Sequence, residues 1–426
     1  MNKHIFIFLF CLLVAHATKA QFGLHLQFLP EQGSAQYLQP AYIGSQEFQY
    51  VQVSTEGTFW IGSTSITLDG ILDEGNYISN SAKNQILSQL EKKNNRLQAG
   101  ASWGLHLNFK ALKRVWQASF RQHTGFYTGI NDSSTVGLVL RGNAPYAGQK
   151  LSDQNVFFRN MRYNEYALAT AFSIGKGKLG IRAKLLQGRQ ATLIDDLSYT
   201  FFTAADGARI EVQSDYNIRK TISGGPNGWG AGVDVGLTYP INEKLSFQAS
   251  LLNLGFINWQ GQRTKSIVDF AYEGTEVDNI LGDDLSSGNF FSMDTLLQLF
   301  FPDTIQSSFN TSLPTSLQIG FSYRLSEKER LHASLHQSFS KASPSTYVPL
   351  LNLAYHYELS PNFLVGANLY GGGIERYGLG LLASTDFIIS EQIRIGIYAA
   401  LDNALGGIIP SNARGLSMQG GISVGW

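Results

Sequence analysis

The sequence predicts an all-β fold, an antiparallel transmembrane β-barrel of about fourteen strands. Most of the chain alternates apolar and polar residues with a period of two, as a strand with two different faces requires. Short and long connections also alternate between these segments. The composition agrees, because 44 Gly and 27 Phe accompany only 15% charged residues, which suits an apolar outer face and small residues inside.

The first twenty residues are typical of a secretory signal peptide. Lys3 gives a positive start, an apolar run covers 5–15, and Thr18-Lys19-Ala20 offers small residues for cleavage. This run is too short for a membrane helix. The one cysteine, Cys11, lies inside it, so we expect a mature chain without cysteine. That expectation excludes disulfide-rich secreted scaffolds and cysteine-ligated metal sites.

The charge and hydropathy of the remaining chain exclude two further classes of protein. Removal of Lys3 and Lys19 leaves 30 basic against 32 acidic residues, with no basic stripe that would indicate nucleic-acid binding. No later apolar run is long enough to cross a bilayer as a helix. We therefore expect strands to cross a bacterial outer membrane, with membrane lipid around them.

Residues 21–56 are expected to form an N-terminal plug-like segment, and 57–426 the barrel. The segment contains Pro30, Gly33, Pro40 and Gly44, and its alternation is short. A barrel of about fourteen strands lies between filled eight-stranded and open sixteen-stranded barrels, so a plug in its lumen is physically reasonable.

From Phe59 onward the alternation is regular and predicts the strands of the barrel. In a clear case, Ile393 and Ile395 share one face and Arg394 lies on the other. The first strand is the least regular. The predicted strands are 57–68, 98–110, 114–128, 164–174, 178–190, 229–239, 244–256, 315–324, 329–340, 347–358, 362–371, 374–386, 391–401 and 415–426.

The last of these strands has the clearest pattern. Leu416, Met418, Ile422 and Val424 alternate with small or polar residues, and Trp426 ends the chain. An aromatic residue in this position suits the lipid–water interface. The terminal pattern resembles the recognition strand through which bacterial outer-membrane barrels are inserted, which implies the barrel-assembly machinery as a partner.

The connections between the strands fall into two classes. The short turns are 111–113, 175–177, 240–243, 325–328, 359–361 and 387–390. The connections between them are 69–97, 129–163, 191–228, 257–314, 341–346, 372–373 and 402–414, and most are much longer. An up-and-down barrel with tight periplasmic turns and elaborated outer loops predicts this pattern, whereas a soluble sandwich or propeller does not.

Three long connections are expected to carry structure of their own. Ile86, Leu87 and Leu90 recur at helical spacing within 81–97 and predict a small extracellular amphipathic helix. A second short helix is predicted over 293–301, before Pro302. Residues 196–219 alternate well and are interpreted as a hairpin beyond the membrane; if the hairpin spanned the membrane, the barrel would have about sixteen strands.

Charged and histidine side chains on the inner face of the predicted strands are the lumen-lining candidates. They would either line a water path or fasten a plug, and the alternation does not choose between these roles. His332 and His336 lie roughly 13 Å apart on a strand, too far to share one zinc ion. The candidates are Lys110, Arg121, Glu165, Arg182, Lys184, Asp234, Arg324, His332, His336, Glu375 and Arg394.

The sequence predicts neither an enzyme nor a cofactor or metal site. An outer-membrane phospholipase needs a lipid-facing catalytic triad, whereas His106 and His123 point inward. Asp278, Asp283 and Asp284 lack the spacing of a calcium loop and are better explained as a solvated acidic loop. The glycine-rich stretch 223–228 is not followed by the lysine and helix of a phosphate-binding loop.

Two resemblances rest on local motifs. Leu38-Gln39-Pro40-Ala41-Tyr42-Ile43-Gly44 resembles the Asn-Pro-Ala type motif of long-chain fatty-acid transporter (FadL-like) barrels, with Gln39 in place of the usual Asn. That resemblance implies a barrel whose N-terminal plug enters the lumen. The implied plug residues are Gln39, Pro40, Ala41 and Tyr42.

A closer resemblance covers nearly the whole mature chain. The helical insert near 81–97 and the stretches 162–168 and 313–325 resemble a Bacteroidota family of predicted outer-membrane barrels without assigned function. Two functions therefore stay open. One is a channel, transporter or binder of small molecules, hydrophobic ones included. The other is a non-transporting anchor that presents loops 69–97, 191–228 and 257–314 to a partner protein such as a secretion-system component.

Overall fold

A computed structural model describes residues 24–30, 32, 35–45, 50–71, 79–222, 225–272, 304–339, 349–390 and 393–426. Within these ranges sixteen strands form one antiparallel sheet. The strands are β1 (Val51–Ser63), β2 (Asn95–Ala111), β3 (Arg114–Ile130), β4 (Lys150–Ile174), β5 (Gly177–Thr203), β6 (Ile210–Thr221), β7 (Gly228–Pro240), β8 (Leu245–Tyr272), β9 (Ile305–Ser312), β10 (Ser316–Arg324), β11 (Glu329–Ser338), β12 (Leu350–Ser360), β13 (Phe363–Gly371), β14 (Tyr377–Ser390), β15 (Ile393–Leu401) and β16 (Gly415–Gly425).

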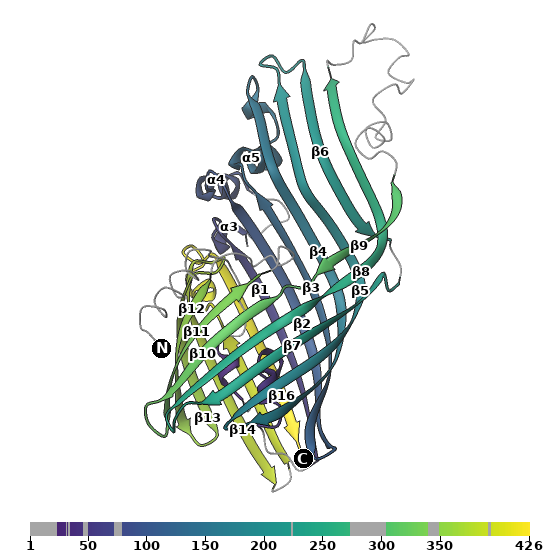
Figure 1. Cartoon of the computed structure of the whole chain (residues 1–426). Helices are drawn as coiled ribbons and strands as arrows, with labels where there is room; N and C mark the ends of the chain where they lie inside the picture. Colours follow the sequence, from purple (N-terminus) through teal and green to yellow (C-terminus); the bar gives the residue numbers. More distant parts are fainter. Residues whose placement is uncertain are drawn as a thin grey trace, which may run out of the picture.

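The sheet closes on itself because β1 pairs with both β2 and β16. The ring runs through β1 to β5, then β7, β8 and β10 to β16, with β5 paired to β7 and β8 to β10 (Figure 1). The two further strands lie on longer neighbours: β6 pairs with β5 and β8, and β9 pairs with β8. The sheet therefore has sixteen strands, not the predicted fourteen or so.

The two extra strands have different origins. β6 belongs to the hairpin expected at 196–219, which continues the sheet beyond the ring. β9 was missed because the chain from 257 to 314 was assigned to a loop, whereas β8 continues to Tyr272 and β9 returns along it. The helix expected over 293–301 and the acidic residues Asp278, Asp283 and Asp284 lie outside the described residues.

The first barrel strand begins earlier than predicted. β1 covers Val51–Ser63, so residues 51–56 belong to the barrel wall, and the plug-like segment is shorter than 21–56. Gln52, Ser54 and Glu56 are buried on the inner side of this strand. Their polar character hid the alternation, because a barrel lined by polar groups reverses the usual rule that the buried face is apolar.

The two faces of the wall differ in the way the alternation predicted. On β2, Trp103, Leu105 and Leu107 are 50%, 45% and 39% exposed, while His106 and Asn108, which alternate with them, are fully buried. Soluble monomers rarely expose such a continuous apolar surface. An apolar outside and a polar inside are what a barrel surrounded by hydrocarbon requires.

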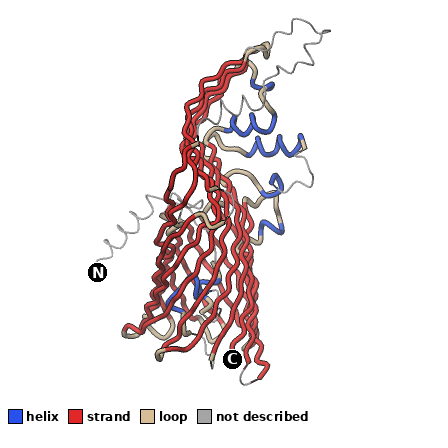
Figure 2. The backbone as a smooth tube through the Cα atoms, turned by 90° about the vertical axis from the view of Figure 1, so that its right-hand side faces the viewer, coloured by secondary structure: helices blue, strands red, loops and turns tan. Residues whose placement is uncertain are grey.

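One side of the barrel projects far beyond the ring (Figures 1 and 2). The long strands β4, β5 and β8 form this projection together with β6 and β9. The helix α5 (Ser133–Arg141) packs beside it, where the Thr135 hydroxyl donates to Asp153 Oδ2 at 2.8 Å and the Tyr199 hydroxyl lies 2.6 Å from Thr135 Oγ1. Burial raises the pKa of Tyr199, which favours the neutral phenol that donates this hydrogen bond.

The helices that the structure describes are short. A helix was expected over 81–97; α4 covers Asn80–Gln89, with Ser79 as its N-cap, and Asn95 already begins β2. No described helix is long and apolar enough to cross a membrane. The other helical elements are η1 (Leu26–Phe28), α2 (Ala35–Leu38), η2 (Pro40–Tyr42), α3 (Leu68–Ile71), η3 (Ala144–Tyr146) and α7 (Leu405–Ile408).

Candidate functional site

The described residues of the stretch 24–43, called here the N-terminal segment, lie inside the ring (Figure 2). At one end the Leu24 amide donates to Asp402 Oδ1 at 3.1 Å, just after β15, near the long connections. In the middle, Leu26, Leu29 and Ala35 pack on inward-facing side chains of β14 and β15. The segment thus crosses the interior from the long connections toward the short turns.

At its far end the backbone of the segment touches the wall. Gln39 Oε1 accepts from the Ala41 amide at 3.3 Å and so caps η2, while Gln39 Nε2 donates to the carbonyl of Ala249 at 3.1 Å. A Cβ added to Gly180 would lie 2.1 Å from the Pro40 carbonyl carbon, and one on Gly236 would lie 1.9 Å from Gln39 Oε1. Glycine at these inward positions of β5 and β7 is therefore what lets the segment fit.

Tyr42 ties the segment to itself and to the wall. Its hydroxyl donates to the carbonyl of Gln27 at 2.8 Å and also contacts Gln248 on β8. All four residues of the Gln39–Tyr42 motif therefore lie in the interior.

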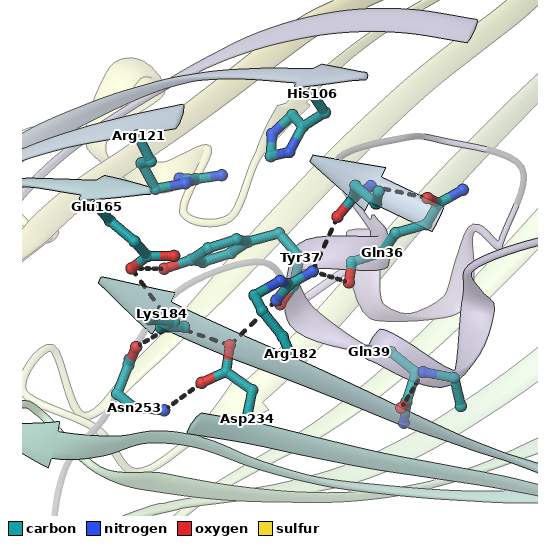
Figure 3. Close-up of polar contacts among 12 residues, drawn as sticks. Gln36, Tyr37, Gln39, His106, Arg121, Glu165, Arg182, Lys184, Asp234 and Asn253 are labelled. Atoms are coloured by element: carbon teal, nitrogen blue, oxygen red, sulfur yellow. Dashed lines mark hydrogen bonds and ion pairs between the residues drawn. The ribbon is translucent and has the colours of Figure 1, made fainter. Parts of the chain in front are cut away.

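Tyr37 is the centre of the polar contacts in Figure 3. Its hydroxyl donates to Glu165 Oε2 at 3.2 Å. Three cations lie over its ring: the distances to the ring centre are 3.8 Å for Arg121 Cζ, 4.9 Å for Arg182 Cζ and 5.0 Å for Lys184 Nζ. Cations gain electrostatic attraction from the face of an aromatic ring, and more when both are removed from water. A single side chain of the segment thus contacts charged groups of β3, β4 and β5.

Arg182 binds the backbone of the segment directly. Its guanidinium donates to the carbonyls of Tyr37 and Gln36 at 2.7 and 2.6 Å, and pairs with Asp234 Oδ2 at 3.1 Å (Figure 3). Lys184 Nζ completes the group, 2.8 Å from Asp234 and 3.3 Å from Glu165. Because Arg182 is fully buried, these partners must compensate the cost of removing its charge from water.

A second set of charges adjoins Tyr37 on the other side. Arg121 pairs with Glu56, and His106 Nε2 lies 3.1 Å from the same carboxylate. His123 Nε2 lies 3.4 Å from Glu165. Three carboxylates therefore face three fixed cations around the segment: Glu56, Glu165 and Asp234 against Arg121, Arg182 and Lys184. The charges balance, as buried charges must.

Histidines form a further contact between segment and wall. His25 Nδ1 lies 3.2 Å from His356 Nε2, and Gln27 Nε2 lies 2.8 Å from His336 Nε2. The Phe28 ring stacks on the His332 ring, with 4.2 Å between the ring centres. Throughout the described ranges, no group of three or more His, Cys, Asp and Glu is placed to hold a metal ion.

The remaining predicted lumen residues lie away from the segment. Glu375 is buried, but it precedes β14 and is not on a strand; Tyr370 and Asn403 each donate to it at 2.6 Å. Arg394 is half-exposed and pairs with Asp386 at 2.9 Å. Lys110 and Arg324 share the inward parity but are exposed at the strand ends beside the short turns. Inward parity therefore does not tell how far along the barrel an inward side chain lies, or whether it belongs to a strand at all.

The structure adds residues that alternation did not single out. Glu56 was missed because it was assigned to the plug-like segment, and Tyr37 because its neighbours show no period. Among the predicted residues, Arg121, Glu165, Arg182, Lys184 and Asp234 are brought together.

The backbone of Trp426 pairs with the start of β1, with its amide 3.0 Å from the Val51 carbonyl. The charged groups around Tyr37 are arranged to hold the N-terminal segment in place. They do not include a nucleophile hydrogen-bonded to a general base.

Comparisons with known proteins give a family and several similar folds. The model of a family described as a family of unknown function (DUF5723) matches residues 40–389. A search of curated proteins found no match. A Pseudomonas aeruginosa FadL homologue is similar over 93% of each chain, with 11% identity and a TM-score of 0.45. The Pseudomonas putida toluene transporter TodX matches over 96% of this chain and 95% of its own, with 10% identity and a TM-score of 0.43. The CymD monoaromatic hydrocarbon channel matches over 92% of each chain, with 11% identity and a TM-score of 0.42.

Proposed function

The chain belongs to the family of unknown function DUF5723, and we propose that it is an outer-membrane channel or carrier for small molecules whose lumen is closed by its N-terminal segment. The observation that carries this proposal is the buried, charge-balanced contact of the segment with the inner wall around Tyr37. The apolar outer face supports a place in a membrane. An interior filled in this way passes solute only when the segment moves.

An apolar cluster above the charges suggests the class of solute. Leu186, Ile257, Trp259 and Phe309 pack together on the inner side of β5, β8 and β9. Tyr163 joins this cluster to the charged layer, because its ring stacks on His123 at 4.6 Å. A solute that displaced this packing would meet apolar groups first and charged groups next, which suits small molecules with hydrophobic parts.

The glycines under the motif provide the test. Gly180→Val should push Pro40 away from the wall without harming the strand, because valine favours strands. We expect flux of small solutes in reconstituted vesicles to rise several-fold. Gly57→Val is the matched control, since a Cβ at Gly57 meets nothing within 4 Å, and it should leave flux unchanged.

A deletion gives the second arm. Removal of residues 24–45 leaves β1 intact, because this strand begins at Val51. We expect the shortened protein to show higher flux than the parent and to keep the heat-modifiable gel mobility of a folded barrel. Equal flux through parent and shortened protein would show that the segment does not close the lumen.

The projection supports a second candidate function. It extends far beyond the ring on one side (Figure 1) and offers a surface that a channel alone does not need. In this case the barrel would anchor a partner protein. A partner that co-purifies with the full chain, is lost when residues 198–215 are removed, and accompanies unchanged flux in Gly180→Val would favour the anchor.

A further inference from the structure

A row of arginines crosses the projection. Arg159 on β4 lies opposite Leu193 on β5, which lies opposite Arg219 on β6, and Arg219 lies opposite Arg263 on β8. Residues directly opposite one another in antiparallel strands share a face. Like charges in such positions are destabilising, so the Arg219 and Arg263 pair is a cost that the fold alone does not explain.

Among the described side chains, one carboxylate pairs with this row. Asp195 pairs with Arg159 at 2.8 Å and also with Arg219. Arg263 Nε donates to Asn217 Oδ1 at 3.0 Å, and no carboxylate among the described residues pairs with Arg263. Among the side chains of this row that the structure describes, three guanidinium groups and one carboxylate leave an excess of two positive charges.

A cavity lies beside Arg219 and Arg263. It has a volume of ≈ 290 Å³ and opens between β6, β8 and β9, where Asn217, Arg219, Arg263, Ser307 and Phe309 line it. Arg219 Nε is buried and has no hydrogen-bond partner. Asn217 Oδ1 already accepts from Arg263, so the amide NH₂ of Asn217 is left to donate. The cavity therefore offers many donors.

The wall behind these donors is apolar. The guanidinium carbon of Arg219 lies 5.6 Å from the centre of the Phe309 ring, and Trp259 stacks behind that ring at 6.3 Å. Arginine combines a planar fork of donors with the ability to lie against aromatic rings. A ligand with an oxyanion and a small apolar part matches both features.

We propose that this cavity binds a phosphate group, carried by a free organophosphate or by a lipid headgroup. A phosphate monoester is close to a dianion at neutral pH and would offset the two positive charges, whereas a carboxylate would offset one. Its oxygens accept from two guanidinium groups at once. Phe309 supplies the contact for the adjoining apolar part. This site is separate from the N-terminal segment and does not depend on solute passing through the barrel.

Binding of phenyl phosphate tests the free source. The purified full chain in a nonionic detergent would be titrated by calorimetry, with benzyl alcohol as the uncharged control. We expect Arg263→Gln to weaken phenyl phosphate binding at least tenfold and added salt to weaken binding to the parent. Arg209→Gln is the matched control, because Arg209 is at the tip of the projection, pairs with Glu211 and loses the same charge. Its affinity should stay within twofold of the parent.

Phosphatidic acid tests the lipid source. Native mass spectrometry would compare its retention with that of diacylglycerol, which lacks the phosphate. Retention by the parent and Arg209→Gln, with loss in Arg263→Gln, would support a lipid headgroup; the same pattern for phenyl phosphate alone would support a free ligand. The proposal is overturned if Arg263→Gln and Arg209→Gln behave alike toward both probes.

A second variant guards against misfolding of the first. Asn217→Asp keeps the size of the side chain and places a carboxylate beside Arg263. We expect it to remove binding of both probes, because it supplies from the protein the charge that the phosphate would supply. Heat-modifiable gel mobility shows that each variant is folded. Parent-like binding by a folded Asn217→Asp would also contradict the site.

Discussion

At the scale of single residues, Tyr37 shows why an aromatic with a hydroxyl suits the interior of this barrel. Its ring meets three cations and its hydroxyl meets Glu165, so one side chain satisfies both signs of charge. An apolar residue would leave the Glu165 oxygen without this donor, and a charged one would upset the balance of the cluster. The segment is therefore held by charges of the wall without carrying a charge of its own at this point.

The strongest single contact of the segment is predicted to be Arg182. In Arg182→Met the carbonyls of Gln36 and Tyr37 lose their donor and Asp234 loses one of its cations. Removal of one partner of a buried ion pair costs roughly 3–5 kcal/mol, so we expect the free energy of unfolding to fall by about that amount. Urea unfolding in detergent micelles measures it.

The same variant should also loosen the segment. Limited chymotrypsin digestion of folded protein should cut the segment in Arg182→Met, at aromatic residues such as Phe28 and Tyr37, and spare it in the parent. Arg209→Met, at the exposed tip of the projection, is the control. Its free energy of unfolding should stay within about 0.5 kcal/mol of the parent, and its N-terminal segment should resist the protease as the parent's does. An Arg182→Met protein as stable as the control would mean that the buried pair is not what holds the segment.

Sequence reasoning singled out five residues of this cluster and missed Tyr37 and Glu56. The parity of a strand tells which side chains share a face, and it placed Arg182, Lys184 and Asp234 inward together. It could not find Tyr37, because that residue is on a segment without a period. It also grouped Lys110 with the others, since parity does not say where along its length a strand leaves the ring.

At the scale of elements, alternation located the ring strands within a few residues, because each has an apolar outer face. It failed where strands leave the ring. Beyond it, β4, β5 and β8 no longer separate an apolar outside from a polar inside, so their outer halves were read as loops. β1 failed for the opposite reason, since polar Ser54 and Glu56 are its buried face.

The orientation of these elements gives a prediction that needs no background correction. The only cysteine of the chain, Cys11, is in the predicted signal peptide, so each introduced cysteine should be the only one in the mature protein. Asp206 is exposed at the tip of the projection, and Glu243 is exposed in the short turn between β7 and β8. We expect a membrane-impermeant maleimide to label Asp206→Cys on intact cells.

The short turn should behave in the opposite way. Glu243→Cys should be labelled only after the outer membrane is made permeable, because short turns of such barrels face the periplasm. Labelling of both variants after permeabilisation controls for expression and reactivity. If Glu243→Cys were the variant labelled on intact cells, the barrel would be inserted in the opposite direction.

At the scale of the whole molecule, the barrel exists only because its first and last strands meet. β1 and β16 pair from Gln52 opposite Gly425 to Gly62 opposite Gly415. Contacts between residues so far apart in sequence form late, because the intervening chain must be ordered first. An open sheet would expose two unpaired edges to lipid, where each unsatisfied backbone group costs several kcal/mol. Closure is therefore the step that a membrane barrel must complete.

Trp426 is placed to influence this step. Its amide lies 3.0 Å from the Val51 carbonyl, its own carbonyl accepts from the Tyr50 amide at 2.7 Å, and its side chain is 42% exposed. Deletion of Trp426 removes three closing hydrogen bonds, worth about 0.5–1.5 kcal/mol each, together with an aromatic residue suited to the lipid interface. We expect protein refolded in detergent to lose only about that much free energy of unfolding.

In cells we expect the deletion to have a much larger effect, namely a smaller fraction of the protein that is heat-modifiable and inserted in the membrane. Trp426→Phe keeps the backbone and an aromatic side chain and should assemble nearly as well as the parent. Equal membrane insertion of the deletion and of Trp426→Phe would mean that the terminal residue contributes nothing to assembly beyond its share of the folded state.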